Sequence, residues 1–576
     1  MKEQMLALDR LRIRVGREAW LAVLWVAAGV ALFGLTLLAS LRIAPSIDNQ
    51  GRDNAIYATI GQVILEGGVP YRDAWDNKTP GAYYLDALFL GVFGVSQWAL
   101  WIGELLTIFV AALVMSHLLR RMTRRRLVAA VGSAVFVLLA RHPGFASGGN
   151  FTESYALLPQ VLCLALGYVF LMRPGLRNGF AVGLAASLVF LVKQTSVGVV
   201  FAFLPALLIS GHPVIRAPRR AAWLAAIVAG GLTGIGVVAA YLAQHGVLGL
   251  ALDAALVHPI AYHTWASEES SSLWRAVLGT LTQSQVIPAL GPLLPLWAVA
   301  VADVARRRHA ASPPNSRESA AAALTVWALV TLLVDLVLVN ITGREYRHYY
   351  ITLAASASLL AAAGVAVIVR TGTLWPGTRR RGAMWVASAV VYTLAVSAAQ
   401  PAVVTLGELS RAGWDVRGPA RETWLSRYVI QHTEPDDQVL VWGARAQVNF
   451  QSGRMSPTRY HYSYPLIIEG YTSEERVRDM VDELKASPPA LIVDTAIIDG
   501  PWVPPLDPSV RALWRDANGR PAIAALEPFF AYVNDACHVQ DILGQVMVYR
   551  CAGHDPAGHL SGPAPGTQGA TGQPAD

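Results

Sequence analysis

Long apolar runs alternate with short polar loops over the first 404 residues of the chain. About 20 consecutive apolar residues are enough to cross the hydrocarbon core of a bilayer as an α-helix. The pattern therefore predicts a polytopic α-helical membrane protein with about eleven transmembrane helices. These helices are expected near residues 19–41, 97–119, 127–140, 154–172, 179–192, 196–210, 221–243, 283–304, 320–340, 350–369 and 383–404.

The loops between these runs are alternately basic and poor in basic residues. Basic loops remain in the cytoplasm by the positive-inside rule, so the N-terminus is predicted inside and the C-terminus, after eleven crossings, outside. This alternation requires two crossings from the single run 179–210, which Lys193, Gln194 and Thr195 interrupt in the middle. We expect two short arms that meet at or below the outer mouth of a protein-lined cavity.

From about residue 405 the composition becomes that of a soluble α/β domain. The stretches 438–443 and 490–495 predict buried strands, and 473–487 predicts an amphipathic helix with a serine cap. The last residues are rich in Gly, Pro and Ala and are predicted to be disordered. The expected organisation is a transmembrane domain at 1–404 with a first outer loop at 43–96, a small extracytoplasmic α/β domain at 405–555, and a tail at 556–576.

Composition and charge agree with a membrane protein. The chain is 54% hydrophobic and 15% charged, and its net charge of +7 falls in loops, where it sets topology. Nucleic acid is therefore not an expected partner, whereas membrane lipids are. Arginine greatly outnumbers lysine, which together with the Ala-rich runs suggests a bacterial origin and hence a multi-pass protein of the bacterial cell membrane. Lys78 and Lys193 stand beside apolar runs and are unusual for this chain.

The three cysteines do not have the spacing of a metal site. Cys163 lies in an apolar run, and Cys537 and Cys551 lie near the C-terminus. If the C-terminal domain is extracytoplasmic, the last two either form a disulfide or remain free thiols.

Five polar clusters fall on the predicted outer face. Ionisable groups at membrane depth are costly and usually functional, so the clusters suggest a site at the outer leaflet. They are residues 46–84, "GGNFTESY" (148–155), "KQT" (193–195), "HPIAYHTWASEES" (258–270) and "GREYRHYY" (343–350).

The stretch 46–84 of the first outer loop contains five carboxylates in different settings. Asp53 is predicted at the N-cap of a short interfacial helix, where it is either only a cap or a carboxylate facing the cavity. Asp73, Asp76 and Lys78 are expected to shape the following turn by pairing with one another, and Asp76 and Lys78 are also candidates for substrate binding. Glu153 either helps to cap its helix through Thr152 or supplies a second carboxylate.

The cluster at 343–350 brings basic residues to a loop that should be poor in them. Arg344, Arg347 and His348 precede the tenth apolar run, with Tyr349 beside them. Together with Lys193 they suit a lipid-linked phosphate, because Arg forms a bidentate clamp and Lys supplies a point charge. The alternative is that this aromatic and basic cluster anchors the helix among lipid headgroups.

These residues resemble the GT-C superfamily of membrane glycosyltransferases over roughly residues 19–404. The resemblance rests on "RDNAIYATIGQVILEGGVPYRDAWDNKTPGAYYLDALFLGVFG", "NFTES", "FLVKQT" and "GREYRHYY", in this order. It is most like bacterial family 39 and Rgt-like enzymes, which are related to protein O-mannosyltransferases and lipid A aminoarabinose transferases. Many relatives have Asp-Glu in the first loop, where this chain has Asp53 and Asn54.

The resemblance implies a hexosyl- or pentosyltransferase that moves a sugar from a polyprenyl-phosphate donor to a glycan, lipid or protein hydroxyl on the outer face. It places the catalytic role on Asp53, with Asp48 as the second choice. Transfer needs a base for the acceptor proton and cations for the departing phosphate. Lys193, Arg344 and His348 are candidates for the phosphate, and Glu153 and Gln194 for positioning the sugar or the acceptor.

One candidate base without a paired nucleophile predicts a direct displacement with inversion. No ligand spacing indicates a metal, although a divalent ion shared by Asp53, Glu153 or His348 is left open. The alternative function is a transporter or flippase of a polyprenyl-linked or anionic solute; transporters usually contain internal repeats, and no repeated half is visible here. A third is a non-catalytic envelope scaffold whose C-terminal domain binds glycan.

Overall fold

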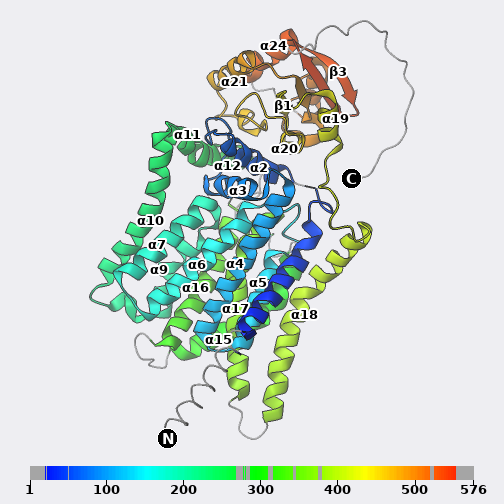
Figure 1. Ribbon diagram of the computed structural model, residues 1–576. Helices are drawn as coiled ribbons and strands as arrows, with labels where there is room; N and C mark the ends of the chain where they lie inside the picture. The colour runs from blue at the N-terminus through cyan, green and yellow to red at the C-terminus, as the bar shows by residue number, and fades with distance from the viewer. Residues whose placement is uncertain are drawn as a thin grey trace, which may run out of the picture.

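The computed structural model describes residues 20, 23–49, 51–267, 277, 279, 286–308, 316–341, 346–373, 379–518 and 524–552. A helical bundle carries a small α/β domain at one end, and short helices of the first outer loop lie between the two (Figure 1). The predicted tail and Arg344 lie outside the described residues.

Eight helical stretches in the described part of the chain are long and apolar enough to cross a membrane. Three of them, the first helix, α10 and α18, bury few of their apolar side chains, and apolar surface of this extent suits contact with lipid. The long helices are the first helix (Val23–Ile43), α4 (Gln97–Thr123), α6 (Thr152–Met172), α10 (Arg220–Gln244), α14 and α15 (Val286–Leu290 and Leu294–Arg308), α16 (Arg317–Leu338), α17 (Ala354–Thr373, preceded by η6, Arg347–Leu353) and α18 (Arg379–Arg411).

The three remaining apolar runs form the shorter helices α5 (Arg126–Ala140), α7 (Leu176–Val192) and α8 with α9 (Gly198–Phe201 and Phe203–Ser210). All eleven apolar runs are thus helical where they are described. The number of crossings and their orientation stay predictions.

The chain reverses at Lys193, in the middle of the run 179–210. Lys193 ends α7 with extended dihedral angles (φ −153°, ψ 109°). The Gly198 N–H then donates to Asp335 near the end of α16, whereas Ser210 lines a cavity with Glu318 at the start of α16. The second arm therefore runs antiparallel to α16, and the predicted break in the run is confirmed.

Glycines allow α7 and α10 to touch along their backbones. A Cβ at Gly183 would lie 1.8 Å from the Ile227 carbonyl oxygen, and one at Gly230 would lie 2.0 Å from that of Phe180. Small residues are the usual means of close helix packing in a membrane. The first arm of the reversed segment is held firmly in this way.

The C-terminal domain is built on a four-stranded sheet of order β1-β2-β4-β3. β1 and β2 are parallel, and β4 is antiparallel to both β2 and β3. The strands and helix predicted at 438–443, 490–495 and 473–487 are confirmed. The elements are α19 (Trp424–His432), β1 (Val439–Trp442), α20 (Gln447–Ser452), α21 (Glu474–Ala486, capped by Ser473), β2 (Leu491–Asp494), α22 (Ala496–Asp499), α23 (Pro508–Asn518), α24 (Glu527–Ala536), β3 (Cys537–Leu543) and β4 (Val546–Cys551).

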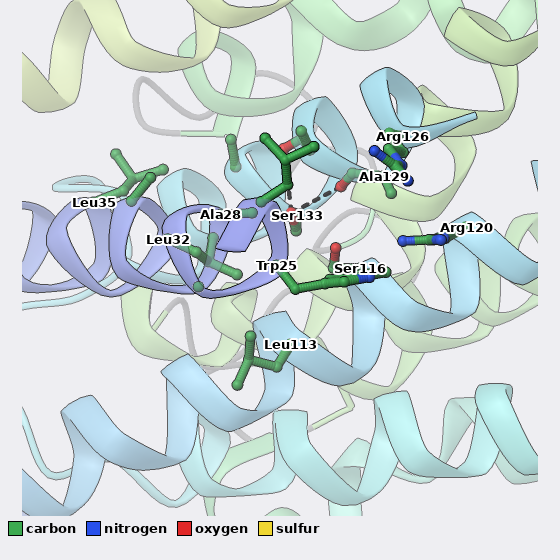
Figure 2. Close-up of a pocket in the computed structure, with 15 residues that line it drawn as sticks. Trp25, Ala28, Leu32, Leu35, Leu113, Ser116, Arg120, Arg126, Ala129 and Ser133 are labelled. Atoms are coloured by element: carbon green, nitrogen blue, oxygen red, sulfur yellow. Dashed lines mark hydrogen bonds between the residues drawn. The ribbon is translucent and has the colours of Figure 1, made fainter. Parts of the chain in front are cut away.

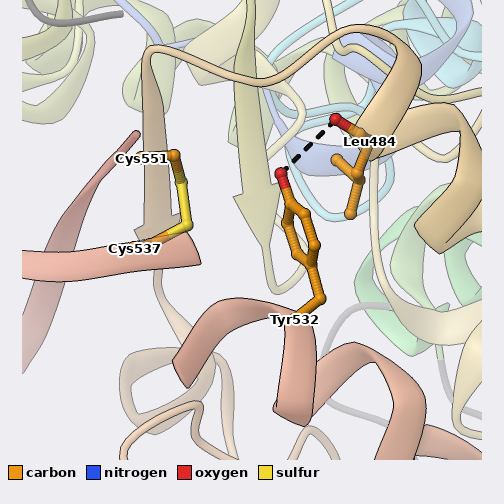
Figure 3. The surroundings of a disulfide bond; sticks show 4 residues. All are labelled: Leu484, Tyr532, Cys537 and Cys551. Carbon is orange, nitrogen blue, oxygen red and sulfur yellow. Dashed lines mark hydrogen bonds between the residues drawn. A yellow bond between two sulfur atoms is a disulfide. The ribbon is translucent and has the colours of Figure 1, made fainter. Parts of the chain in front are cut away.

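Cys537 and Cys551 form a disulfide across the β3–β4 hairpin, where the register pairs them directly. Figure 3 shows it beside α24, whose Tyr532 hydroxyl donates to the Leu484 carbonyl at the end of α21 (3.4 Å). Of the two alternatives for these cysteines, the structure contains the disulfide.

The C-terminal domain docks on the first outer loop, which contains α2 (Arg52–Leu65) and α3 (Gly81–Phe93). A single hydrophobic core includes Ile60 and Trp75 of this loop together with Trp442 and Leu484 of the domain. The two regions therefore share one core. Two short helices from the 245–267 segment, α11 (Leu248–Leu252) and α12 (His258–Ser267), flank it (Figure 1).

Candidate functional site

Asp53 lies in the first turn of α2. Gly51 is the N-cap and its carbonyl accepts from the Ala55 N–H, so the prediction that Asp53 is the N-cap is wrong. Gly51 has the extended conformation of an N-cap (φ −69°, ψ 168°), and Arg52, the first helical residue, pairs with Asp499 of the C-terminal domain 3.2 Å away. Asp53 is thereby free of a capping bond, and the positive end of α2 favours its negative charge.

The Asp53 carboxylate faces the η6 segment. Its Oδ2 lies 4.0 Å from Nε2 of His348, and 52% of the Asp53 side chain is exposed. His348 is stacked on Phe151 with the ring centres 4.4 Å apart, and Tyr349 meets it edge to face at 4.8 Å. The histidine ring is therefore held in one orientation beside a reachable carboxylate.

A buried ion pair lies next to these groups. Lys193 Nζ is 2.7 Å from Glu153 Oε1, and both side chains are almost fully buried. The same ammonium lies 4.8 Å from the ring centre of Tyr349. A buried charge is tolerated only with a close partner, so each member of the pair stabilises the other.

Glu153 does not cap its helix through Thr152. Phe151 is the N-cap of α6, and the Thr152 hydroxyl donates to Glu153 Oε2 instead (3.0 Å). Of the two alternatives for Glu153, the structure therefore favours a carboxylate placed among the site residues, here engaged by Lys193.

The turn after α2 is organised by tyrosines. Asp76 is buried and accepts from Tyr83 and Tyr462 hydroxyls, each at 2.8 Å. Asp73 pairs with its neighbour Arg72 (2.8 Å), and Lys78 donates to the side chain of Asn77.

The expected pairing among Asp73, Asp76 and Lys78 is wrong, because burial offers Asp76 two hydroxyl donors that the sequence pattern does not reveal. The turn is tied to the break after α7, since Gln194 Nε2 donates to the Asn77 carbonyl (2.9 Å). Lys78 and Gln194 therefore lie close to Lys193.

Asp48 and Asn54 form hydrogen bonds with the 148–150 loop. The Asp48 carboxylate accepts from the Gly148 N–H (2.7 Å), and burial raises its pKa. Asn54, adjacent to Asp53, is fully buried and donates to the Gly149 carbonyl, while Asn150 Nδ2 donates to the Asn54 carbonyl (3.1 Å). The two neighbours Asp53 and Asn54 thus point to different surroundings, one toward the site and one into the protein.

Two residues of the site escaped sequence reasoning. His258 lies 3.2 Å from Asn77 and edge to face with Trp75 (4.8 Å), and burial lowers its pKa to about 3. Tyr462 reaches Asp76 from the C-terminal domain. His258 belongs to a polar cluster visible in the sequence, whereas nothing local links Tyr462 to the first loop.

The structure brings together all the described candidates. Seven of them converge at one end of the bundle under the C-terminal domain: Asp53, Lys78, Glu153, Lys193, Gln194, His348 and Tyr349. Asp76 is buried between Tyr83 and Tyr462. Among the described residues, no group of three or more His, Cys, Asp or Glu side chains is placed to share a metal ion.

Comparisons place this architecture among known proteins. A family model described as dolichyl-phosphate-mannose-protein mannosyltransferase matches residues 77–240. ArnT from Cupriavidus metallidurans, solved bound to undecaprenyl phosphate, is 14% identical with a TM-score of 0.54 over 91% of this chain and 97% of its own. Its apo structure gives the same identity and TM-score, over 92% and 98%. No curated protein matches the sequence.

A further similar structure is that of the arabinofuranosyltransferase AftD from Mycobacteria. It is 16% identical with a TM-score of 0.44, over 92% of this chain and 40% of its own. The likeness to ArnT shows that this multi-pass membrane protein has the fold of the GT-C glycosyltransferases. The resemblance inferred from the sequence is confirmed by the family match and by this fold.

Proposed function

We propose that the protein is a glycosyltransferase that moves a sugar from a polyprenyl-phosphate-linked donor to an acceptor hydroxyl at the outer face of the bacterial cytoplasmic membrane. One observation carries the proposal: the half-exposed Asp53 carboxylate faces His348 beside the buried Glu153–Lys193 pair. A reachable base, with the Lys78 ammonium nearby beside Gln194, suits transfer from a lipid phosphate. The fold shared with an ArnT solved with undecaprenyl phosphate supports the donor class.

The reaction we propose is a single displacement. The acceptor oxygen attacks the anomeric carbon, and the bond between that carbon and the phosphate oxygen breaks. Its electron pair leaves with the polyprenyl phosphate, while the acceptor proton passes to the Asp53 carboxylate. Attack opposite the departing phosphate inverts the anomeric centre.

The cations divide into two groups. Lys193 is neutralised by Glu153, so this pair positions Tyr349 and the surrounding site instead of supplying net charge to a phosphate. Lys78 forms no ion pair among the described residues, and its hydrogen-bond partner Asn77 is uncharged. We therefore assign the departing phosphate to the Lys78 ammonium and to a hydrogen bond donated by the His348 ring, with Arg344 as the further cation expected from the sequence.

The assignment is tested in membranes that contain the full-length protein and radiolabelled polyprenyl-phosphate sugars. Asp53→Asn should abolish transfer while the protein still inserts and folds. Asp73→Asn is the matched control, because it makes the same change in the same loop at an acid that is paired with Arg72. Full transfer by Asp53→Asn would overturn the assignment, and loss in both variants would show a general effect of the loop charge.

The donated sugar is identified by a second measurement. Lipids extracted from the purified protein and analysed by mass spectrometry should include a polyprenyl phosphate linked to a hexose or a pentose. Loading the Asp53→Asn variant with the same pool should trap the donor uncleaved. A protein that carries no polyprenyl lipid under any of these conditions would count against the donor class.

A further inference from the structure

An apolar groove lies at the end of the bundle far from the candidate site. The first turn of α4 is near the C-terminal domain, where Gln97 donates to the Arg421 carbonyl (3.3 Å). Arg120 near the other end of α4 lies about 35 Å away, at about 1.5 Å per helical residue. A cavity of about 280 Å³ opens there between the first helix, α4 and α5 (Figure 2).

The walls of the groove are mostly apolar and combine small residues with leucines. Leu32 and Leu113 lie on two of its sides, and a Cβ added at Gly29 would meet nothing within 4 Å. The Ser133 hydroxyl donates to the Ala129 carbonyl within its own helix (2.8 Å), as Figure 2 shows. The Ser133 hydroxyl is therefore already hydrogen-bonded, and the groove presents mainly hydrocarbon. Such a space suits an alkyl chain better than water.

Two arginines stand at one end of this groove. The Arg120 guanidinium lies 3.9 Å above the ring of Trp25, and Arg126 lines the same cavity (Figure 2). Within the described ranges, neither arginine forms an ion pair. Tryptophan and arginine together mark the level of lipid headgroups, and two uncompensated guanidinium groups attract a phosphate.

We propose that this groove binds an anionic glycerophospholipid, with one acyl chain between the first helix and α5 and its phosphate on Arg120 and Arg126. The charge at one end and the hydrocarbon walls along the rest match the two parts of such a lipid. By the positive-inside rule this end faces the cytoplasm, so the lipid comes from the inner leaflet. The site is independent of the proposed transferase chemistry.

Lipid retention by the full-length protein tests the proposal. The protein is equilibrated with mixed vesicles of phosphatidylglycerol and phosphatidylcholine, purified in detergent, and its bound lipid is quantified by mass spectrometry. Arg120→Gln/Arg126→Gln should retain about tenfold less phosphatidylglycerol. Arg121→Gln/Arg124→Gln is the control, because it removes the same charge from the same loop and leaves the groove unchanged.

A third variant separates the chain from the headgroup. Gly29→Leu adds a side chain at a lining position whose Cβ would meet nothing within 4 Å, and it leaves both arginines in place, so it should also lower phosphatidylglycerol retention. Equal losses in the two arginine double variants would overturn the proposal, because they would indicate general attraction to the basic loop. Unchanged retention in Gly29→Leu would overturn it too, since the acyl chain would then lie elsewhere.

Discussion

Two aspartates of the first outer loop have different surroundings, and we infer that one serves the chemistry and the other the fold. Asp53 lies in the first turn of α2, stays half exposed and faces His348. Asp76 is 2% exposed and accepts hydrogen bonds from two tyrosine hydroxyls. A carboxylate that must accept a proton from substrate needs access, whereas a buried one needs donors. We therefore expect Asp53 to control turnover and Asp76 to control folding.

The largest expected effect is on transfer by Asp53→Asn. Loss of the general base should lower the transfer rate about 1,000-fold, within the usual range for such a group. The temperature of unfolding in detergent should stay near that of the unmodified protein, because Asp53 is half exposed. Initial rates and a thermal unfolding curve measure both quantities, and a large drop in unfolding temperature would contradict the division between the two aspartates.

Asp76→Ala should have the opposite result. It deprives Tyr462 of its acceptor, whereas the Tyr83 hydroxyl can still donate to the Lys78 carbonyl (3.1 Å). One unsatisfied buried hydroxyl should cost about 2 kcal/mol of unfolding free energy. Asp76→Asn keeps one acceptor oxygen and should lose less. Thermal unfolding of the three proteins gives the order; a stable Asp76→Ala protein with no transfer would instead assign Asp76 to the chemistry.

The stability of the folded protein should also depend on pH, because His258 is buried close to Asp76. The folded protein keeps this ring neutral down to a pKa of about 3, against 6.5 in the unfolded chain. Between these values the unfolded state binds more protons, so stability falls as the pH is lowered, by about 2 kcal/mol at about pH 5.

His258→Phe should remove this part of the pH dependence, since an aromatic ring can still pack against Trp75. For each protein, the change in unfolding temperature between neutral and acidic buffer is measured, and the two changes are compared. Burial lowers the pKa of His461 to about 4, and this residue adds the same pH dependence to both proteins, so it cancels in the comparison. An identical pH dependence in the variant would show that His258 is accessible to protons in the folded state.

The smallest expected effect is that of Tyr462→Phe. It removes one of the two hydroxyls that reach Asp76 and should cost about 1 kcal/mol, because the ring stays packed against Trp75. Tyr464→Phe is the control, since the Tyr464 hydroxyl makes no hydrogen bond within the described residues. Equal shifts in unfolding temperature for the two variants would indicate that the contact with Asp76 contributes nothing.

Several elements were predictable because their signals are local. The break at Lys193 follows from a polar interruption between two apolar arms, and the strand at 490–495 follows from a short apolar run. The errors occurred where a distant partner intervened. Arg52 at the start of α2 pairs with Asp499 of the C-terminal domain, and Asp76 accepts from Tyr462 of that domain instead of pairing with Lys78.

The sequence by itself determined the apolar runs, the basic loops and the polar clusters, because helix length, charge bias and periodicity act over one or two turns of chain. Only the tertiary structure decided which polar residues meet. The pairing of Glu153 with Lys193, the approach of His348 to Asp53 and the contact of Tyr462 with Asp76 join segments far apart in the chain. Such contacts depend on how helices pack and on what burial excludes, and no local pattern encodes them.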